Sequence, residues 1–395
     1  MKLPGVASRS AARKSSLKKG SSIPAPCADG VALPHLLPHC GLEEHKGTDS
    51  DGDEHNGNSI GRDDFDVLEL LGQGGFGEVK LVQCNRNGQL YAMKAVEKRA
   101  VHERRYFGDD EAKRRAQAER DIGVMTRQWQ CPFIIELCAA FQTGEKLYYI
   151  FEYCPQGDLY EQLVAQPSGR FAEATACFYV AEICLALEHL HMHDTIHRDV
   201  KLENVLIASD GHVKLADFGI AKANLPSQGA RPSYAFGGTD GASMLYPPEF
   251  HRGELYGKDL DCWQLGVAAF LMLAGRLPQP GGVGAGLPQA TSQAAGALCR
   301  GLLEEERQRR LGHPDGAIQL RGHAFFREVN WRALHAKAVE PPALCDPEAQ
   351  SLRGSARPTV KTRGRVSDFF RLRNFSFIGS VFRRATSRRS SRASR

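Results

Sequence analysis

Four short motifs carry most of the residues in this chain whose types and spacing could do chemistry. In order they are Leu71-Gly72-Gln73-Gly74-Gly75-Phe76-Gly77-Glu78-Val79, Tyr91-Ala92-Met93-Lys94, His197-Arg198-Asp199-Val200-Lys201-Leu202-Glu203-Asn204 and Asp217-Phe218-Gly219. Glycines let a backbone approach phosphate groups, a lysine can hold phosphate oxygens, and Asn and Asp oxygens suit Mg²⁺. A glycine-rich loop alone would be a weak signal, but the ordered set predicts phosphoryl transfer from a nucleotide.

The ordered set resembles the signature motifs of eukaryotic protein kinases. The resemblance implies that the γ-phosphoryl group of ATP moves to a protein hydroxyl, with ATP and Mg²⁺ as cofactors. It also implies an α+β fold of two lobes, with a β-rich small lobe over 65–153 and a helical large lobe over 154–326.

The resemblance assigns the ATP site to the glycine-rich loop, the third strand and the hinge after Phe151, a bulky gatekeeper. The expected ATP-binding residues are Leu71, Gly72, Gln73, Gly74, Gly75, Phe76, Gly77, Glu78, Val79, Ala92, Lys94, Glu152 and Cys154. Cys154 could be a reactive thiol, but an ordinary half-buried cysteine is the simpler interpretation.

The catalytic loop supplies the expected chemistry. Asp199 is the candidate base for the attacking hydroxyl, and Lys201 would offset charge on the transferred phosphate. Lysine at that position favours Ser/Thr over tyrosine substrates. Asn204 and Asp217 are the expected Mg²⁺ ligands.

Lys94 needs a carboxylate to hold it, and Glu119 on the following helix is the best candidate. The alternative is that Glu119 is one more solvated acid on a charged helix.

The elements that must position these residues can be read from the sequence pattern. Order begins near Phe65, and strands are expected over 65–71, 78–83, 90–96 and 146–153, with short strands around Val205 and Val213. Helices are expected over 109–126 and 174–193.

Motifs beyond the core resemble the AGC group, which contains the cyclic-nucleotide-dependent kinases, protein kinase C and the ribosomal S6 kinases. The matching segments are Tyr91-Ala92-Met93-Lys94, Arg310-Leu311-Gly312, His323-Ala324-Phe325-Phe326, Val329-Asn330-Trp331 and Leu372-Arg373-Asn374-Phe375-Ser376-Phe377. The resemblance implies an AGC-type tail over 327–380 that returns to the small lobe, with Ser376 as a candidate phosphosite. The alternative for that motif is an amphipathic peptide without phosphate.

The same resemblance implies contacts to substrate. Asp158, Glu203 and Thr239 occupy substrate-binding positions, and the two acids would each face a substrate arginine. The expected partners are therefore protein substrates with Arg about three residues before the Ser/Thr, and an upstream kinase.

The activation segment departs from the family. Ala235 stands where relatives have a phosphorylatable Thr, so the sequence leaves the partner of Arg198 open, and Ser233, a candidate phosphosite, lies nearby but out of register. Glu249 remains, with Arg310 as its expected partner. The stretch 275–292 is Gly/Pro-rich and shorter than in relatives, which favours loss of the usual docking helix, and Gly123 stands where a large apolar residue usually stacks.

Charge is distributed unevenly along the chain. Residues 1–28 carry six Lys/Arg and no acid, and residues 350–395 carry thirteen with one acid, while 29–349 hold 32 basic and 45 acidic residues, a net charge of −13. The basic ends could contact an anionic membrane or nucleic acid, or simply be solvated. Residues 1–62 are expected to be a disordered extension.

The last segment, 381–395, is rich in Arg and Ser, and Thr386 has the Arg-at-minus-three pattern of an autophosphorylation site. Eleven cysteines without a CxxC pair indicate free thiols in a reducing compartment. We expect an intracellular, cytoplasmic monomer, with the nucleus or a membrane surface as alternative addresses. The functional alternative is a catalytically weak kinase-fold scaffold that acts by binding partners.

Overall fold

The computed structural model describes residues 60–74, 77–98, 109–232, 242–279, 286–344 and 377–378. Some sequence predictions therefore fall outside the described residues. These are the predictions for Gly75, Phe76, Ser233, Ala235, Thr239, Ser376, Thr386 and the segments 1–59 and 381–395.

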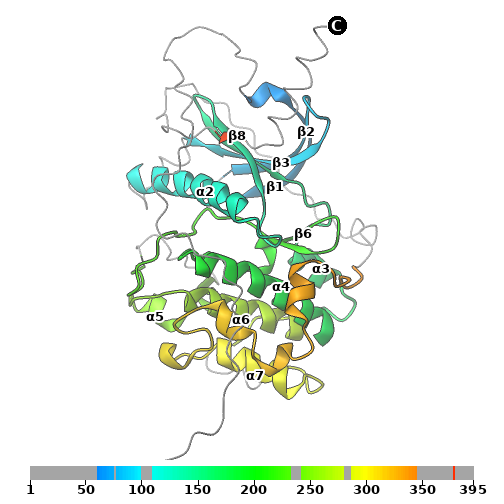
Figure 1. The fold of residues 1–395 in the computed structure, drawn as a ribbon, viewed down its shortest axis with the longest axis vertical. Helices are drawn as coiled ribbons and strands as arrows, with labels where there is room; N and C mark the ends of the chain where they lie inside the picture. Colours follow the sequence, from blue (N-terminus) through cyan, green and yellow to red (C-terminus); the bar gives the residue numbers. More distant parts are fainter. Residues whose placement is uncertain are drawn as a thin grey trace, which may run out of the picture. The chain divides into compact units, whose positions relative to one another are not determined.

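A six-stranded antiparallel sheet forms the small lobe (Figure 1). Its strands, in spatial order, are β1 (Phe65–Gly74), β2 (Gly77–Cys84), β3 (Leu90–Glu97), β5 (Lys146–Glu152), β4 (Leu137–Gln142) and β8 (Phe377–Ile378). Tyr91, Met93 and Ala95 alternate along β3 and join one buried apolar cluster, as expected for a strand with one face on the core. The predicted strands are confirmed, but β4 was not predicted.

Helix α2 (Asp109–Trp129) packs against β4. It ends at Trp129 rather than at Thr126, so the residues before Pro132 lengthen the helix. Gln130, which follows the helix, has a φ of +56°. Ile122 and Val124 are buried apolar side chains in the part of α2 whose side chains are described.

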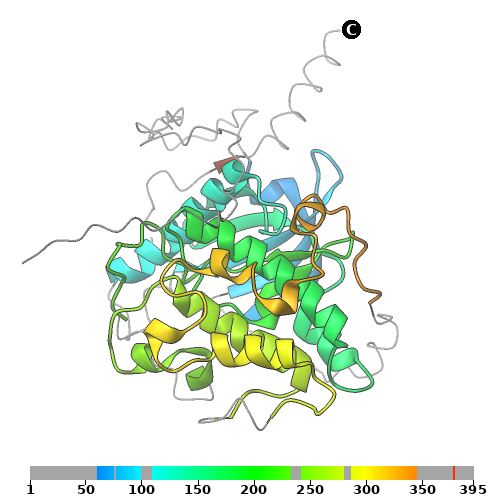
Figure 2. The same cartoon turned by 60° about the horizontal axis from the view of Figure 1, so that its bottom comes forward.

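The large lobe is helical, and Figure 2 shows its helices from below. Its longer helices are α3 (Leu159–Ala165), α4 (Glu173–Met192), α6 (Asp259–Ala274) and α7 (Gln293–Leu302), and its short helices are α5 (Pro248–His251) and α8 (Trp331–His335). Short 3-10 turns link them: η2 (Leu202–Asn204), η4 (Ala242–Leu245), η5 (Arg307–Arg309), η6 (Ala317–Leu320) and η7 (Ala324–Phe326). A further turn, η1 (Arg62–Asp64), precedes β1.

Helices α4 and α6 form the centre of the large-lobe core. Both are apolar around most of their circumference, as expected of helices enclosed by neighbours. Helix α6 is capped at its C-terminal end by Gly275, whose φ is +71°. A Cβ at that position would lie 2.4 Å from the carbonyl oxygen of Gly169, so the turn requires glycine.

A two-stranded hairpin, β6 (Val205–Ile207) and β7 (Val213–Leu215), separates the two motifs His197–Asn204 and Asp217–Gly219. Leu215 also bridges to Ile134, which follows α2. These contacts attach the hairpin to the chain that leads into the small-lobe sheet. The end of the first motif and the start of the second are therefore each next to an ordered strand.

The segment after α6 is described in two parts. Within its described parts, 275–279 and 286–292, there is no helix between α6 and α7. Ser292 caps α7 by accepting a hydrogen bond from the Ala295 N–H. None of the helices in the described ranges is long and apolar enough to span a bilayer.

The C-terminal segment contacts both lobes in its described parts. Lys337 pairs with Asp210 in the β6–β7 turn, with 2.9 Å between Nζ and Oδ2. Further on, Phe377 and Ile378 form β8 and pair with Ala140 and Ala139 of β4. The prediction that the tail returns to the small lobe is confirmed for these two residues.

Candidate active site

Lys94 joins three elements at one point. It lies on β3 opposite Val79 of β2, and its Nζ is 2.6 Å from Glu119 Oε1 on α2 and 2.9 Å from Asp217 Oδ1. The predicted pair with Glu119 is therefore present. Because Glu119 is only 6% exposed, the alternative of a solvated acid is wrong.

The three groups shift one another's ionisation. Burial alone would lower the pKa of Lys94, but the carboxylates of Asp217 and Glu119 together raise it. The Lys94 ammonium in turn lowers the pKa of Asp217 to about 2. Burial raises the pKa of Glu119 despite the ammonium beside it. Lys94 and Asp217 are thus both charged at neutral pH, as a phosphate clamp and a cation ligand require.

Asp199 is held by two neighbours in the catalytic loop. Lys201 Nζ lies 2.8 Å from Asp199 Oδ2, and the Asn204 side-chain amide donates to both the carbonyl oxygen and Oδ2 of Asp199 at 2.8 Å. The side-chain nitrogen of Asn204 is therefore directed to Asp199. The Asn204 Oδ1 is left as the atom suited to a hard cation. The loop folds this way because η2 forms directly after Lys201 and places Asn204 one turn away.

Asp217 has a φ of +62°, a conformation that non-glycine residues seldom adopt. The next residue, Phe218, is 2% exposed and lies edge-on to His197, with 5.0 Å between ring centroids. His197 Nε2 hydrogen-bonds the Ala216 carbonyl at 3.0 Å. Phe218 belongs to the large buried cluster that also includes Ile122 of α2.

The glycine-rich turn is shaped by two different constraints. Among the described residues no atom lies within 4 Å of a Cβ built on Gly72, so they leave this side of the backbone open to a ligand. At Gly77 a Cβ would lie 2.0 Å from the Ala95 carbonyl oxygen of β3. Glycine is therefore required at position 77 by the packing of β2 against β3, in addition to any need for a bound phosphate to approach the backbone.

The hinge is anchored by the Glu152 side chain. Glu152 Oε1 accepts from the Glu136 N–H and pairs with Lys214 Nζ of β7, both at 2.8 Å. Cys154 is 9% exposed, and burial raises its pKa to about 12. This thiol is protonated at neutral pH, which favours the ordinary buried cysteine over the reactive one.

The predicted substrate acids lie near each other. Asp158 caps α3 by accepting from the Glu161 N–H at 2.8 Å. Burial raises the pKa of Asp158 to about 6, and the negative charges of Glu161 and Glu203 add to the rise. Such a carboxylate gains from an incoming guanidinium, which would supply the missing positive charge.

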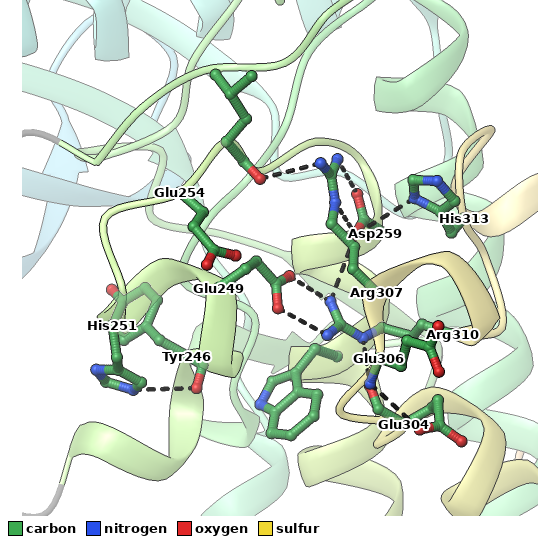
Figure 3. A network of polar contacts seen from close by, with 12 residues as sticks. Tyr246, Glu249, His251, Glu254, Asp259, Glu304, Glu306, Arg307, Arg310 and His313 are labelled. Atoms are coloured by element: carbon green, nitrogen blue, oxygen red, sulfur yellow. Dashed lines mark hydrogen bonds and ion pairs between the residues drawn. The ribbon is translucent and has the colours of Figure 1, made fainter.

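A buried polar network underlies the end of the activation segment (Figure 3). Arg310 Nη1 and Nη2 bind the two carboxylate oxygens of Glu249 at 2.5 and 2.8 Å, which confirms the predicted pair. The Arg310 guanidinium also lies 5.0 Å from the ring centre of Trp263. Trp263 donates from Nε1 to the Met244 carbonyl at 3.1 Å. The stacked Arg310 and Trp263 therefore support the chain just before α5.

Sequence reasoning missed three residues that hold the catalytic loop. Asp261 accepts from the N–H groups of His197 and Arg198, Gln264 binds Val200 N–H and Arg198 C=O, and the Tyr256 hydroxyl accepts from Arg198. Nothing local in the run Asp261-Cys262-Trp263-Gln264 assigns it to a loop some sixty residues earlier.

The family profile of the protein kinase domain matches residues 65–326. The chain belongs to the protein kinase family. The curated relatives that it matches are kinases of the AGC group, so this chain is an ATP-dependent Ser/Thr protein kinase of that group.

Three relatives show how far the similarity extends. The kinase is 36% identical to the Arabidopsis thaliana "Serine/threonine-protein kinase AtPK2/AtPK19" over 87% of this chain and 68% of the relative. It is 36% identical to "Protein kinase C zeta type" of Oryctolagus cuniculus over 72% of this chain and 49% of the relative. It is 34% identical to "Ribosomal protein S6 kinase alpha-6" of Mus musculus over 80% of this chain and 42% of the relative. The kinase thus spans less than half the length of the last two.

Proposed function

We propose that this kinase transfers the γ-phosphoryl group of Mg·ATP to Ser or Thr residues that follow an arginine by about three positions. The observation that carries the proposal is the contact of Lys94 with both Glu119 and Asp217, beside a catalytic loop in which Asp199 is held by Lys201 and Asn204. These contacts bring the residues with the expected roles into one arrangement.

ATP and Mg²⁺ fit the groups present. The ionised Asp217 and the Asn204 Oδ1 are hard oxygen donors, and the described residues leave the space at a Gly72 Cβ open. When bound, the cation would neutralise charge on the phosphates. Lys94 would hold phosphate oxygens, and Glu119 would keep the lysine in place.

Asp199 is suited to orient the substrate hydroxyl and to receive its proton. The Lys201 ammonium beside it can stabilise negative charge on the transferred phosphoryl group. The hydrogen bonds from Asn204 fix the carboxylate in one orientation, so little reorganisation is needed when the hydroxyl arrives.

Asp158 and Glu203 support the preference for arginine. Both are acidic, the negative charge of Glu203 helps to raise the pKa of Asp158, and α3, which Asp158 caps, contacts η2, which carries Glu203. A guanidinium between them would relieve that repulsion.

The test uses two peptides that differ only in Arg or Ala three residues before the Ser. We expect the Arg peptide to be preferred, and Asp158→Asn with Glu203→Gln to lower kcat/KM for it by about tenfold while barely changing the Ala peptide. Glu145→Gln, at an exposed acid in the β4–β5 turn, is the control. Equal use of both peptides would contradict the specificity, and ATP binding without any transfer would favour the scaffold alternative.

A further inference from the structure

Arg198 immediately precedes Asp199 and has a φ of +70°. Its backbone is held in this uncommon conformation by α6. The Arg198 N–H donates to Asp261 Oδ1, and its carbonyl accepts from Gln264 Nε2, both at 2.8 Å. The position of Asp199 therefore depends on how Arg198 is held.

The Arg198 side chain binds the start of the activation segment and a tyrosine. Its Nε donates to the Ile220 carbonyl at 2.5 Å, its Nη2 donates to the Ala221 carbonyl at 3.4 Å, and its Nη1 donates to the Tyr256 hydroxyl at 2.9 Å. The guanidinium thus connects the catalytic loop to the residues after Asp217 and to the segment before α6.

Tyr256 is held both by apolar packing and by backbone hydrogen bonds. It is 1% exposed and packs in an apolar cluster with Ile196, Phe250 and Leu260. Its backbone exchanges two hydrogen bonds with Ala230 of the activation segment, at 2.8 and 2.9 Å. One residue therefore contacts the activation segment through its backbone and the catalytic loop through its hydroxyl.

The turn that carries Tyr256 is held by Arg307 (Figure 3). Arg307 Nη1 donates to the Leu255 carbonyl at 3.0 Å, and its Nε and Nη2 bind the buried Asp259 carboxylate at 2.7 and 2.9 Å. A bidentate arginine–carboxylate contact is both strong and directional. The contacts of Arg307 on both sides of Tyr256 consequently fix the position of the hydroxyl that binds Arg198.

We propose that Tyr256 is a positioning residue that secures Arg198, and through it Asp199, in the place of a phosphate on the activation segment. The AGC resemblance implies a phosphothreonine partner for Arg198, but the corresponding residue in this chain is Ala235, which has no hydroxyl to modify. This kinase then organises its catalytic loop without phosphorylation of that segment. The inference rests on the proposed function, since it concerns the same phosphoryl-transfer site.

The experiment measures peptide phosphorylation by the full chain before and after treatment with a broad-specificity protein phosphatase, with mass spectrometry to confirm that phosphate is removed. Tyr256→Phe deletes only the hydroxyl. We expect it to lower kcat about tenfold while KM for ATP and peptide change less than about twofold. Phosphatase treatment of the wild type should change kcat by less than about twofold.

Tyr179→Phe is the matched control, because the Tyr179 hydroxyl is also buried but has no hydrogen-bond partner among the described residues. It should leave kcat unchanged. A double-mutant cycle separates positioning from general loss of structure: in an Arg198→Met background, adding Tyr256→Phe should cost less than about twofold in kcat.

Each outcome bears on the proposal. An active wild type whose kcat survives Tyr256→Phe, or is lost when mass spectrometry shows that the phosphate removed came from the activation segment, overturns this inference and leaves the proposed function standing. Equal losses from Tyr256→Phe in the wild-type and Arg198→Met backgrounds overturn it as well. A wild type that binds ATP but transfers nothing overturns both the inference and the proposed function.

Discussion

Replacing Gly123 by alanine should destabilise this kinase, although alanine is the better helix former. A Cβ at position 123 would lie 2.8 Å from Leu137 Cδ2 and 2.9 Å from Leu137 Cβ, closer than real Cβ contacts allow. Leu137 is fully buried on β4, so it has little room to move. The large apolar residue expected at 123 is absent because Leu137 fills that space.

The magnitude follows from two opposing effects. Gly→Ala in a helix interior gains about 1 kcal/mol, whereas overpacking a buried site costs about 1–3 kcal/mol. The net change in the free energy of unfolding should therefore be a loss of about 1 kcal/mol. Because Glu119 lies one turn before Gly123, a displaced α2 should also weaken the contact with Lys94 and lower kcat.

Denaturant unfolding and steady-state kinetics measure both effects. Gly296→Ala in α7 is the control, since the Cβ there would meet only the flexible end of Arg300 at 3.2 Å and the helix should gain stability. Adding Leu137→Ala to Gly123→Ala should cost less than the two single changes together. If Gly123→Ala stabilises the protein as Gly296→Ala does, the packing explanation is refuted.

Three further predictions follow from the described contacts. Asp158, with a pKa of about 6, should lose its charge as pH falls through that value. Between pH 7 and 5, kcat/KM should therefore drop more for the Arg-containing peptide than for the Ala peptide. Parallel pH profiles for the two peptides would contradict the role of Asp158 in binding the substrate arginine. Arg310→Met leaves Glu249 buried without its partner and should lower the free energy of unfolding by about 3–5 kcal/mol, whereas Arg309→Met, at an exposed arginine, should change it little; equal effects would refute the importance of the pair. Cys154, with a pKa of about 12, should react with iodoacetamide far more slowly in the native than in the denatured chain at pH 7.5, and equal rates would show that the thiol is accessible and ionised.

Local signals made the catalytic centre predictable. The residues around Lys94, Asp199 and Asp217 stand in contiguous motifs whose order is specific to one family, and the structure brings Lys94 into contact with Asp217 and Lys201 into contact with Asp199. The pair Glu249–Arg310 was also predicted, because each partner lies in a motif of its own.

Features that depend on packing were not predictable. Strand β4 is buried on both faces, so its sequence Leu-Cys-Ala-Ala-Phe-Gln shows no alternation from which a strand could be read. The role of Tyr256 depends on a contact with Arg198 across 58 positions, and no local pattern marks it. The space at Gly123 is filled from another element, whereas the sequence showed only a weakened helix.

The most direct test of the central claim is transfer of labelled phosphate from Mg·ATP to the Arg-containing peptide by the wild type, Asp199→Asn and Asp194→Asn. The control residue lies in the same loop, with a side chain that is 64% exposed and paired with Lys258. Transfer by the wild type and Asp194→Asn, with loss in Asp199→Asn at unchanged ATP affinity, is the predicted result. Undiminished transfer by Asp199→Asn, or none by the wild type with ATP bound, would contradict the assignment of this site.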